Sequence, residues 1–278
     1  MKFIAKLAST PQEHAAARAL RYQVFVQELG GSGAMVDHGT GQEQDPFDPF
    51  CDHLILLADP QDADPQNTDP HRDGPTGAPQ PQPQPHPHSQ GKVVGVYRLM
   101  RSAQAAQAGQ FYSESEYDLG KLRASGRNLL ELGRSCVHPA YRGGPALFHL
   151  WSALASYVAR HQIDLLFGVA SFHGTDQAPL AMPLSLLFHR YLAPEALRVR
   201  AKDYTPMDII APPDLDARQA MQAMPALIKS YLRLGGVVGD GAFIDRPFNT
   251  TDVCLILDTQ TMNARQARFY QGASHDLG

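Results

Sequence analysis

The chain has 278 residues, 43% hydrophobic and 19% charged, so it can bury a substantial core as one enlarged domain or as one domain with an appendage. The net charge of −4 argues against general nucleic-acid binding, although basic residues outnumber acidic ones over residues 98–202, either as surface scatter or as a region that meets an acidic partner or a phosphate. No apolar run is long enough to cross a membrane, the first residues are too polar for a signal peptide, and three cysteines without framework spacing indicate reduced thiols, so we expect a cytoplasmic protein.

The N-terminal region predicts a strand followed by a helix. Apolar and polar residues alternate over residues 2–7, as in a strand with one buried face. Thr10, Pro11 and Glu13 then form a helix start, with Thr10 as the cap and Glu13 completing a capping box. Apolar positions continue at helical spacing, so we expect one helix over 11–28.

The segment 60–91 differs in kind from the rest of the chain. It holds nine of the 22 prolines and ends in a tract of proline, glutamine and histidine. Such a composition cannot build a core, so we expect a disordered surface insertion. It separates two predicted strands, at 53–57 and 93–100.

The remaining pattern alternates strands and helices. Apolar runs and helical spacing predict, in order, a strand at 129–137, a helix at 147–158, a strand at 165–170, helices at 179–191 and 221–234, and a strand at 252–258. This α/β order predicts a mixed central sheet with helices on both faces and some antiparallel strands.

One loop carries the clearest chemical signal. Residues 137–144, VHPAYRGG, join a predicted strand to a predicted helix. A basic, glycine-containing loop at a helix N-terminus suits an anion, because backbone N–H groups and the helix dipole point at the ligand. A phosphate site and a purely structural turn both remain open on this pattern alone.

This loop resembles the acyl-donor loop of the GNAT superfamily of acyltransferases, which cradles coenzyme A or the phosphopantetheine of a carrier protein. The usual pattern is Arg/Gln-x-x-Gly-x-Gly/Ala, but here Pro145 and Leu147 stand at the glycine positions after Arg142. The departure favours a donor without a nucleotide, namely acyl carrier protein, and no further cofactor.

A narrower resemblance covers residues 20 to 258 outside the insertion. Its motifs begin at Arg21 (RYxVF), Asp45 (DxFDxxCDH), Val94 (VGVYRL), Phe111 (FYSESEYDL), Leu130 (LELGRSCVHP), Phe172 (FHGTD), Ile228 (IKSYLRLG) and Phe248 (FNTTDVC). In these motifs the chain resembles the bacterial ornithine Nα-acyltransferases of ornithine lipid biosynthesis, relatives of the acyl-homoserine-lactone synthases.

The resemblance implies an organisation and partners. We expect a GNAT-like core at 1–203, a C-terminal extension at 204–260 that completes the sheet and the site, and a tail at 261–278. It implies acyl carrier protein as donor, ornithine as acceptor and a separate O-acyltransferase that uses the product. A peripheral membrane contact, for example by the helix ending near Leu234, stays open beside its interpretation as a core helix.

The resemblance also implies the site residues. Arg21, Phe25, Asp45, Asp48 and Arg98 are the expected substrate-binding residues, with aspartates for an amine and arginines for a carboxylate. The expected donor-binding residues are Val137, Arg142, Gly143 and Gly144, and the expected catalytic residues are Glu131, Arg134, Cys136 and Val137.

The geometry of Glu131 and Arg134 needs an irregular strand. Residues three apart on a regular strand face opposite ways, so we expect a β-bulge at Gly133 that turns both side chains to one cleft. Glu131 is then either the general base for the amine or the partner of Arg134 in a salt bridge. A backbone N–H near Cys136 or Val137 would stabilise the oxyanion.

Other interpretations remain open. Cys136 and His138 could act as nucleophile and base, and these residues with Cys51 and His53 could bind zinc, although their spacing is not that of a closed zinc site and no metal is expected. The protein could also be an acyl-homoserine-lactone synthase, or a catalytically silent protein that binds carrier protein or membrane.

Overall fold

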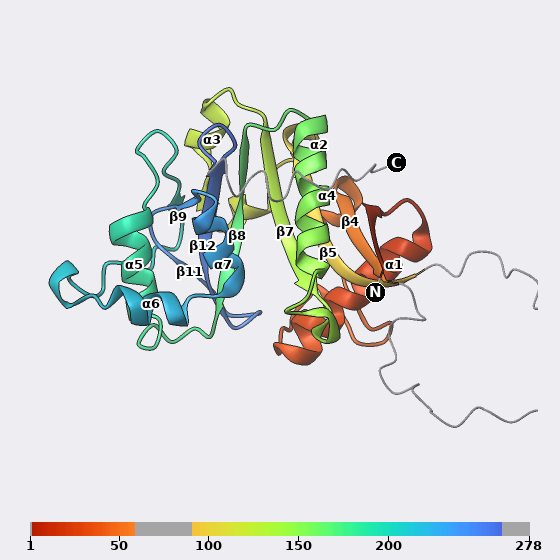
Figure 1. Ribbon diagram of the computed structural model, residues 1–278, viewed down its shortest axis with the longest axis horizontal. Helices are drawn as coiled ribbons and strands as arrows, with labels where there is room; N and C mark the ends of the chain where they lie inside the picture. The colour runs from red at the N-terminus through yellow and green to blue at the C-terminus, as the bar shows by residue number, and fades with distance from the viewer. Residues whose placement is uncertain (1, 59–90, 263–278) are drawn as a thin grey trace, which may run out of the picture.

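The computed structural model describes residues 2–58 and 91–262, and one mixed sheet runs through its centre (Figure 1). The strand order is β1-β4-β5-β7-β8-β12-β10, with β11 also paired to β12. Neighbours are antiparallel except β7 and β8, which are parallel, so the predicted mixed sheet is confirmed. The strands are β1 (Phe3–Leu7), β4 (Asp52–Ala58), β5 (Lys92–Arg101), β7 (Leu129–Val137), β8 (Leu165–His173), β10 (Val237–Val238), β11 (Phe243–Asp245) and β12 (Thr250–Asp258).

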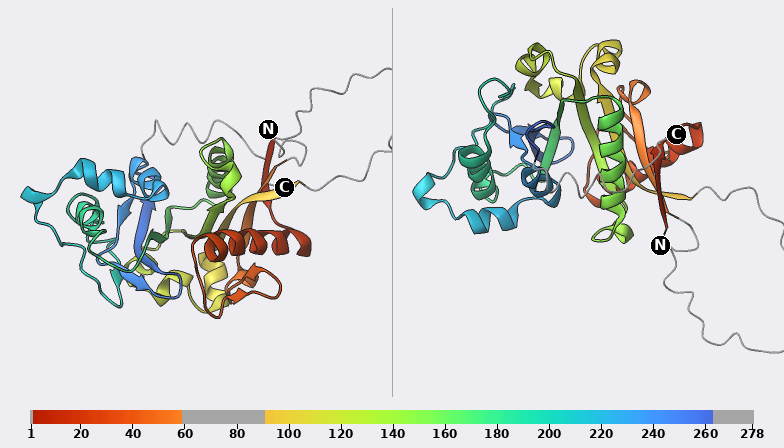
Figure 2. Two further views of the ribbon diagram at one scale, coloured as in Figure 1. Left: turned by 90° about the horizontal axis from the view of Figure 1, so that it is seen from below. Right: turned by 45° about the horizontal axis from the view of Figure 1, so that its top comes forward.

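Helices cover both faces of the sheet (Figure 2). On one face α1 (Pro11–Arg21) packs against β5 and β7, and on the other α4 (Ala146–Arg160) packs against β1, β4 and β5. The capping box at Thr10 and Glu13 is present as predicted. The predicted helix over 11–28 is wrong in its second half, because Tyr22–Glu28 form a π-helix, η1, in which Leu29 donates its N–H to the carbonyl of Val24.

The C-terminal half adds three helices beside the sheet. These are α5 (Ala181–Tyr191), α6 (Ala217–Ala223) and α7 (Ala226–Arg233). The single helix predicted over 221–234 is wrong, because the residue before Pro225 is held in an extended conformation and the helix breaks there. The strand β12 lies between β8 and β10, so this part of the chain shares the central sheet.

Several short elements complete the described chain. They are β2 (Val36–Asp37), β3 (Gln42–Glu43), η2 (Asp48–Phe50), α2 (Ser102–Ala108), η4 (Tyr112–Ser115), β6 (Tyr117–Asp118), α3 (Gly120–Ala124), η5 (Pro139–Tyr141), β9 (Arg200–Ala201) and η6 (Pro212–Asp214). The proline-rich insertion lies outside the described residues except for residue 91, and the C-terminal tail except for residues 261 and 262. Among the described residues, no helix combines the length and apolar character needed to cross a membrane.

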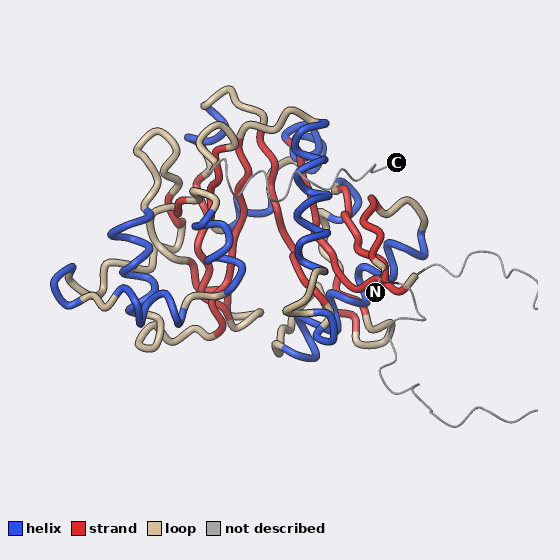
Figure 3. The backbone as a smooth tube through the Cα atoms, viewed as in Figure 1, coloured by secondary structure: helices blue, strands red, loops and turns tan. Residues whose placement is uncertain are grey.

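The sheet opens between its two parallel strands. β7 and β8 pair at Leu129 with Leu165, Leu130 with Leu166 and Glu131 with Phe167, and beyond these pairs the strands separate (Figure 3). At the fork the backbones approach closely, since a Cβ atom on Gly168 would lie 2.1 Å from the carbonyl oxygen of Leu132. The fork therefore needs glycine on β8.

A bulge bends β7 just beyond the fork. Cys136 pairs with Val96 and Gly133 with Arg98, so Tyr97 alone faces both Arg134 and Ser135. Arg134 has a φ of 49°, the left-handed conformation of a bulged residue. The expected bulge is thus present, but one residue after Gly133.

We expect Gly168→Ala to lower the free energy of unfolding by about 3 kcal/mol or more, because the new methyl group collides with backbone rather than with a movable side chain. Urea unfolding followed by circular dichroism measures this. Gly144→Ala is the control, since its Cβ would meet nothing closer than 3.9 Å. Equal stability of the two variants would contradict a tight fork.

Candidate functional site

A cavity of about 270 Å³ lies in the opening between β7 and β8. One half is apolar and belongs to the core cluster beneath α4: Leu132, Leu166, Leu227, Tyr231, Leu255 and Leu257. The other half is polar and includes Tyr112, Glu131, Arg134, Asp245 and Asp252. The cavity is therefore amphiphilic, with its two halves meeting where the sheet divides.

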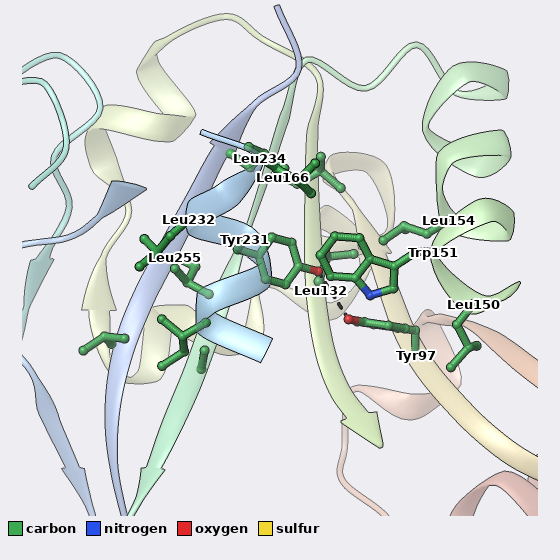
Figure 4. Close-up of a cluster of buried hydrophobic side chains, with 14 of the residues drawn as sticks. Tyr97, Leu132, Leu150, Trp151, Leu154, Leu166, Tyr231, Leu232, Leu234 and Leu255 are labelled. Carbon is green, nitrogen blue, oxygen red and sulfur yellow. Dashed lines mark hydrogen bonds between the residues drawn. The ribbon is translucent and has the colours of Figure 1, made fainter. Parts of the chain in front are cut away.

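Aromatic side chains close the apolar half (Figure 4). Tyr231 of α7 reaches Trp151 of α4, with 4.9 Å between ring centroids. The hydroxyl oxygens of Tyr231 and Tyr97 lie 3.4 Å apart across the gap between the strands. Trp151 is thus a packing residue of this wall.

Six buried charges lie behind the polar half, on the α1 face of the sheet. They are three arginines and three carboxylates, so their charges balance: Arg21, Arg98, Arg134, Glu43, Asp45 and Asp48. Arg21 bonds Glu43 and places Nη1 2.8 Å from Oδ1 of Asp48. Arg98 bonds Asp45, and five of the six side chains are nearly inaccessible to solvent.

This network changes the expected roles of the substrate-binding residues. Arg21, Asp45, Asp48 and Arg98 bind one another, and none of them lines the cavity. Phe25, from the π-helix, does line it. The four charged residues therefore fix the loop before β4 against the sheet, which is a positioning role.

Arg134 connects the network to the cavity. Its Nε lies 3.1 Å from Oε1 of Glu43 and its Nη2 3.1 Å from Oδ2 of Asp45. Its guanidinium also lies 4.6 Å from the ring centroid of Tyr112 and 5.4 Å from that of Phe248. Among the described residues that line the cavity, Arg134 is the one lysine or arginine.

Glu131 lies at the cavity with its carboxylate held by backbone. One oxygen accepts the N–H of Ser113 at 2.6 Å and the other that of Tyr112 at 2.9 Å. Burial raises the pKa of Glu131 despite these hydrogen bonds. The alternative of a salt bridge to Arg134 is wrong, because Arg134 pairs with Glu43 and Asp45.

Near the far end of β7 a backbone N–H points away from β5. His138 donates its N–H to the carbonyl of Val94 on β5 at 2.8 Å, and Cys136 pairs with Val96 on the same strand. Because N–H groups alternate along a strand, that of Val137 points away from β5, towards the gap left by β8. Val137, rather than Cys136, is thus placed to act as an oxyanion donor.

The predicted donor loop leads into α4. Arg142 forms a two-fold ion pair with Glu28 at the end of η1, at 2.5 and 2.7 Å, and its Nε donates to the carbonyl of Val137. Gly143 has a φ of 74° with open space around its Cβ position, and Gly144 is nearly as open. The first N–H groups of α4 follow without a side-chain cap.

The alternative roles for Cys136 gain no support. Its thiol is buried, and burial raises its pKa to about 12, so it is protonated at neutral pH. The ring of His138 instead meets Gln23 and Lys92. Cys51 and His53 are buried elsewhere, beside Asp48. Among the described residues, the side chains close enough together to bind a metal ion are a different group.

That grouping was missed by the sequence analysis. Glu116, Asp245 and Asp252 bring carboxylate oxygens within 4.8 Å of one another. Two of the three belong to motifs that carried the resemblance, at Phe111 and Phe248, but nothing in their spacing predicts that these distant segments meet. Glu43 was missed for the same reason.

Comparisons with known proteins were made on this basis. The sequence model of the acetyltransferase (GNAT) domain matches residues 20–152. The L-ornithine N(alpha)-acyltransferase of Rhodobacter capsulatus is 53% identical, over 95% of this chain and 93% of the relative, and that of Brucella abortus 39%, over 95% and 87%. The structure of FeeM, an N-acyl amino acid synthase from uncultured soil microbes, aligns over 93% of this chain and 92% of its own, with a TM-score of 0.49 and 12% identity.

Asp48→Asn should lower the free energy of unfolding by about 3–5 kcal/mol at pH 7, because it leaves Arg21 and Arg98 partly unpaired in the interior. Burial raises the pKa of Asp48, but the two arginines outweigh it and lower the pKa to about 2. Because the pKa of Asp48 is lower in the folded than in the unfolded state, its ionisation stabilises the fold at every pH above the unfolded-state pKa. This contribution is lost as the pH falls through the folded-state pKa of about 2.

The difference between wild type and variant should therefore shrink by about 2 kcal/mol between pH 5 and pH 2. Urea titrations at several pH values measure it. Glu195→Gln, which removes an exposed partner of Lys121, is the control and should leave the free energy of unfolding nearly unchanged. A pH-independent difference would contradict an ionised, paired Asp48.

Proposed function

The chain belongs to the family of L-ornithine Nα-acyltransferases and carries a GNAT domain, and we propose that it transfers a fatty acyl group from acyl carrier protein to the α-amine of ornithine. Family membership confirms the resemblance drawn from the motifs and the GNAT-like fold. The acceptor is the one named for the relatives. The donor and the roles of individual residues are proposals that rest on the cavity.

The amphiphilic cavity is the observation that supports this reaction best. A fatty acyl chain needs a dry apolar wall, which the leucines and Tyr231 supply. A zwitterionic amino acid needs charged partners, which the polar half supplies. Because both halves meet in the opening between β7 and β8, a thioester carbonyl and an amine can come together in it.

The chemistry is direct transfer. The amine nitrogen attacks the thioester carbon, and the N–H of Val137 stabilises the oxygen as it gains charge. Glu131 lies further back along β7 than Val137, so it accepts the proton of the amine through water, with a lone pair left on each carboxylate oxygen beyond the two backbone bonds. The C–S bond then breaks, an amide forms, and the pantetheine thiol leaves with a proton.

Arg134 is the proposed partner of the substrate carboxylate. It is the cation of the cavity wall, and its ion pairs with Glu43 and Asp45 hold it in place. Since Nε bonds Glu43 and Nη2 bonds Asp45, Nη1 is the group left to donate to the substrate carboxylate, and this charge-assisted hydrogen bond orients the substrate as well as attracting it. The buried network thus acts on the reaction through Arg134.

The donor phosphate has a suitable place at the start of α4. The N–H groups after Gly143 and Gly144 and the helix dipole favour an anion there. Pro145 and Leu147 interrupt the glycine pattern that a coenzyme A pyrophosphate uses, which supports a carrier protein as donor. The product, an acyl amino acid, then requires a separate O-acyltransferase to become a two-chain lipid.

Purified protein incubated with 3-hydroxyacyl carrier protein and ornithine should give Nα-acyl-ornithine, identified by mass spectrometry. We expect the carrier-protein donor to give a kcat/KM about 100-fold or more above that of the same acyl chain on coenzyme A, because the loop lacks a pyrophosphate cradle. A lactone formed from S-adenosylmethionine would indicate the synthase alternative. No product from a folded sample would indicate a silent binding protein.

Glu131→Gln should lower kcat by about 100-fold or more, because it removes the proton acceptor. The pH profile separates this role from the support of η4. If Glu131 is the base, the wild-type rate rises with pH through a pKa above the usual range of glutamate, and the variant loses this limb. An unchanged pH dependence would assign Glu131 to positioning alone.

A further inference from the structure

Three carboxylates converge on the polar half of the cavity from separate parts of the chain. Glu116 follows η4, Asp245 ends β11 and Asp252 lies on β12, and their oxygens lie within 4.8 Å of one another. Asp245 and Asp252 line the cavity. Glu116 and Asp252 are only 3% exposed, so this charge is held out of water.

Arg134 attracts Glu116 and Asp252 from beyond ion-pair distance, but no cation of the described chain forms an ion pair with the three carboxylates. None of them has a lysine, arginine or histidine within ion-pair distance among the described residues, in contrast to the network behind Arg134. Oδ1 of Asp252 and Oε2 of Glu116 also lack a hydrogen-bond partner there. A buried carboxylate oxygen that faces a cavity without a partner indicates a donor that comes with a ligand.

Burial close to other carboxylates disfavours the ionised form of a carboxyl group, which raises the pKa values of Glu116 and Asp252. Burial and the charges of Asp252 and Asp245 raise the pKa of Glu116, and burial, together with Asp245, raises that of Asp252, although Arg134 opposes both shifts. Without a ligand the group retains a proton. A bound cation would replace that proton and restore the charge.

We propose that Glu116, Asp245 and Asp252 bind the side-chain ammonium of a diamino acid acceptor, and so select ornithine over neutral amino acids of the same length. An ammonium has three N–H donors, one for each carboxylate. With the α-carboxylate on Arg134, two fixed ends leave the α-amine as the group free to reach the thioester. This inference rests on the proposed function, because it assigns the acceptor part of the same cavity.

The test compares ornithine with norvaline, which has the same carbon chain and α-amine but no side-chain ammonium. Asp252→Asn keeps the shape of the side chain and removes charge from a repulsive group, so it should fold with unchanged or higher thermal stability. We expect its kcat/KM for ornithine to fall about 100-fold while that for norvaline changes less than about three-fold. Glu116→Gln should act in the same direction.

Asp214→Asn is the matched control, since it makes the same change on an exposed residue of η6 and should leave both rates unchanged. Equal losses with ornithine and norvaline would overturn the proposal, since a base or a structural group serves both substrates alike. Activity abolished by EDTA, with Mn²⁺ binding to wild type but not to Asp252→Asn by calorimetry, would also overturn it in favour of a metal site.

Calorimetry without donor separates failure of this inference from failure of the proposed function. If a folded sample acylates neither amino acid, the proposed function fails, and ornithine and norvaline are then titrated into wild type. Heat from ornithine alone, lost in Asp252→Asn, would support the carboxylate site. Equal heats from both ligands, or none from either, would overturn it.

Discussion

The separation of β7 from β8 is the constraint on which the rest of the structure depends. Two parallel strands that pair at only three positions form no ladder with each other over the remainder of their length. The fork is kept by a steric condition, the approach of Gly168 to the carbonyl of Leu132. An opening inside a sheet is costly unless something fills it, and here leucine and tyrosine side chains line one half while charged groups line the other. The N–H of Val137 points away from β5 towards this opening, which is why it is the donor proposed for a reacting oxygen.

The buried charges explain how one side of the opening is held in shape. The loop before β4 has little regular structure, and its position depends on Glu43, Asp45 and Asp48 meeting Arg21 and Arg98. Such a network adds little net stability over an apolar core, but removal of one member leaves a charge unpaired. The network also positions Arg134. The left-handed backbone of this residue at the bulge and its two ion pairs hold its guanidinium at the cavity.

The sequence predicted the regular elements well because their signals are local. The strand at 129–137 was predicted with its observed ends, and the capping box placed the start of α1. Local signals failed in two places. The π-helix after Arg21 keeps the apolar spacing of an α-helix, so the sequence pattern does not reveal its different hydrogen bonds. Pro225 ends one helix and begins another, so α6 and α7 are separate. The sequence could not predict which charged side chains from distant segments pair with one another. Arg21 and Asp48 were expected at the substrate, yet they are neighbours of each other, which only the packed fold determines.

The two charged groups around the cavity differ in a way that bears on catalysis. The network behind Arg134 is balanced in charge, with as many arginines as carboxylates, so its charge is neutralised without a substrate. Glu116, Asp245 and Asp252 form an unbalanced group, which is stable only when protonated or occupied. Since buried charge is tolerated when it is paired, the balanced group is suited to positioning and the unbalanced one to recognition. A cationic acceptor would neutralise the negative charge of these three carboxylates when it binds. Its affinity would then come from charge that the fold leaves without an ion pair.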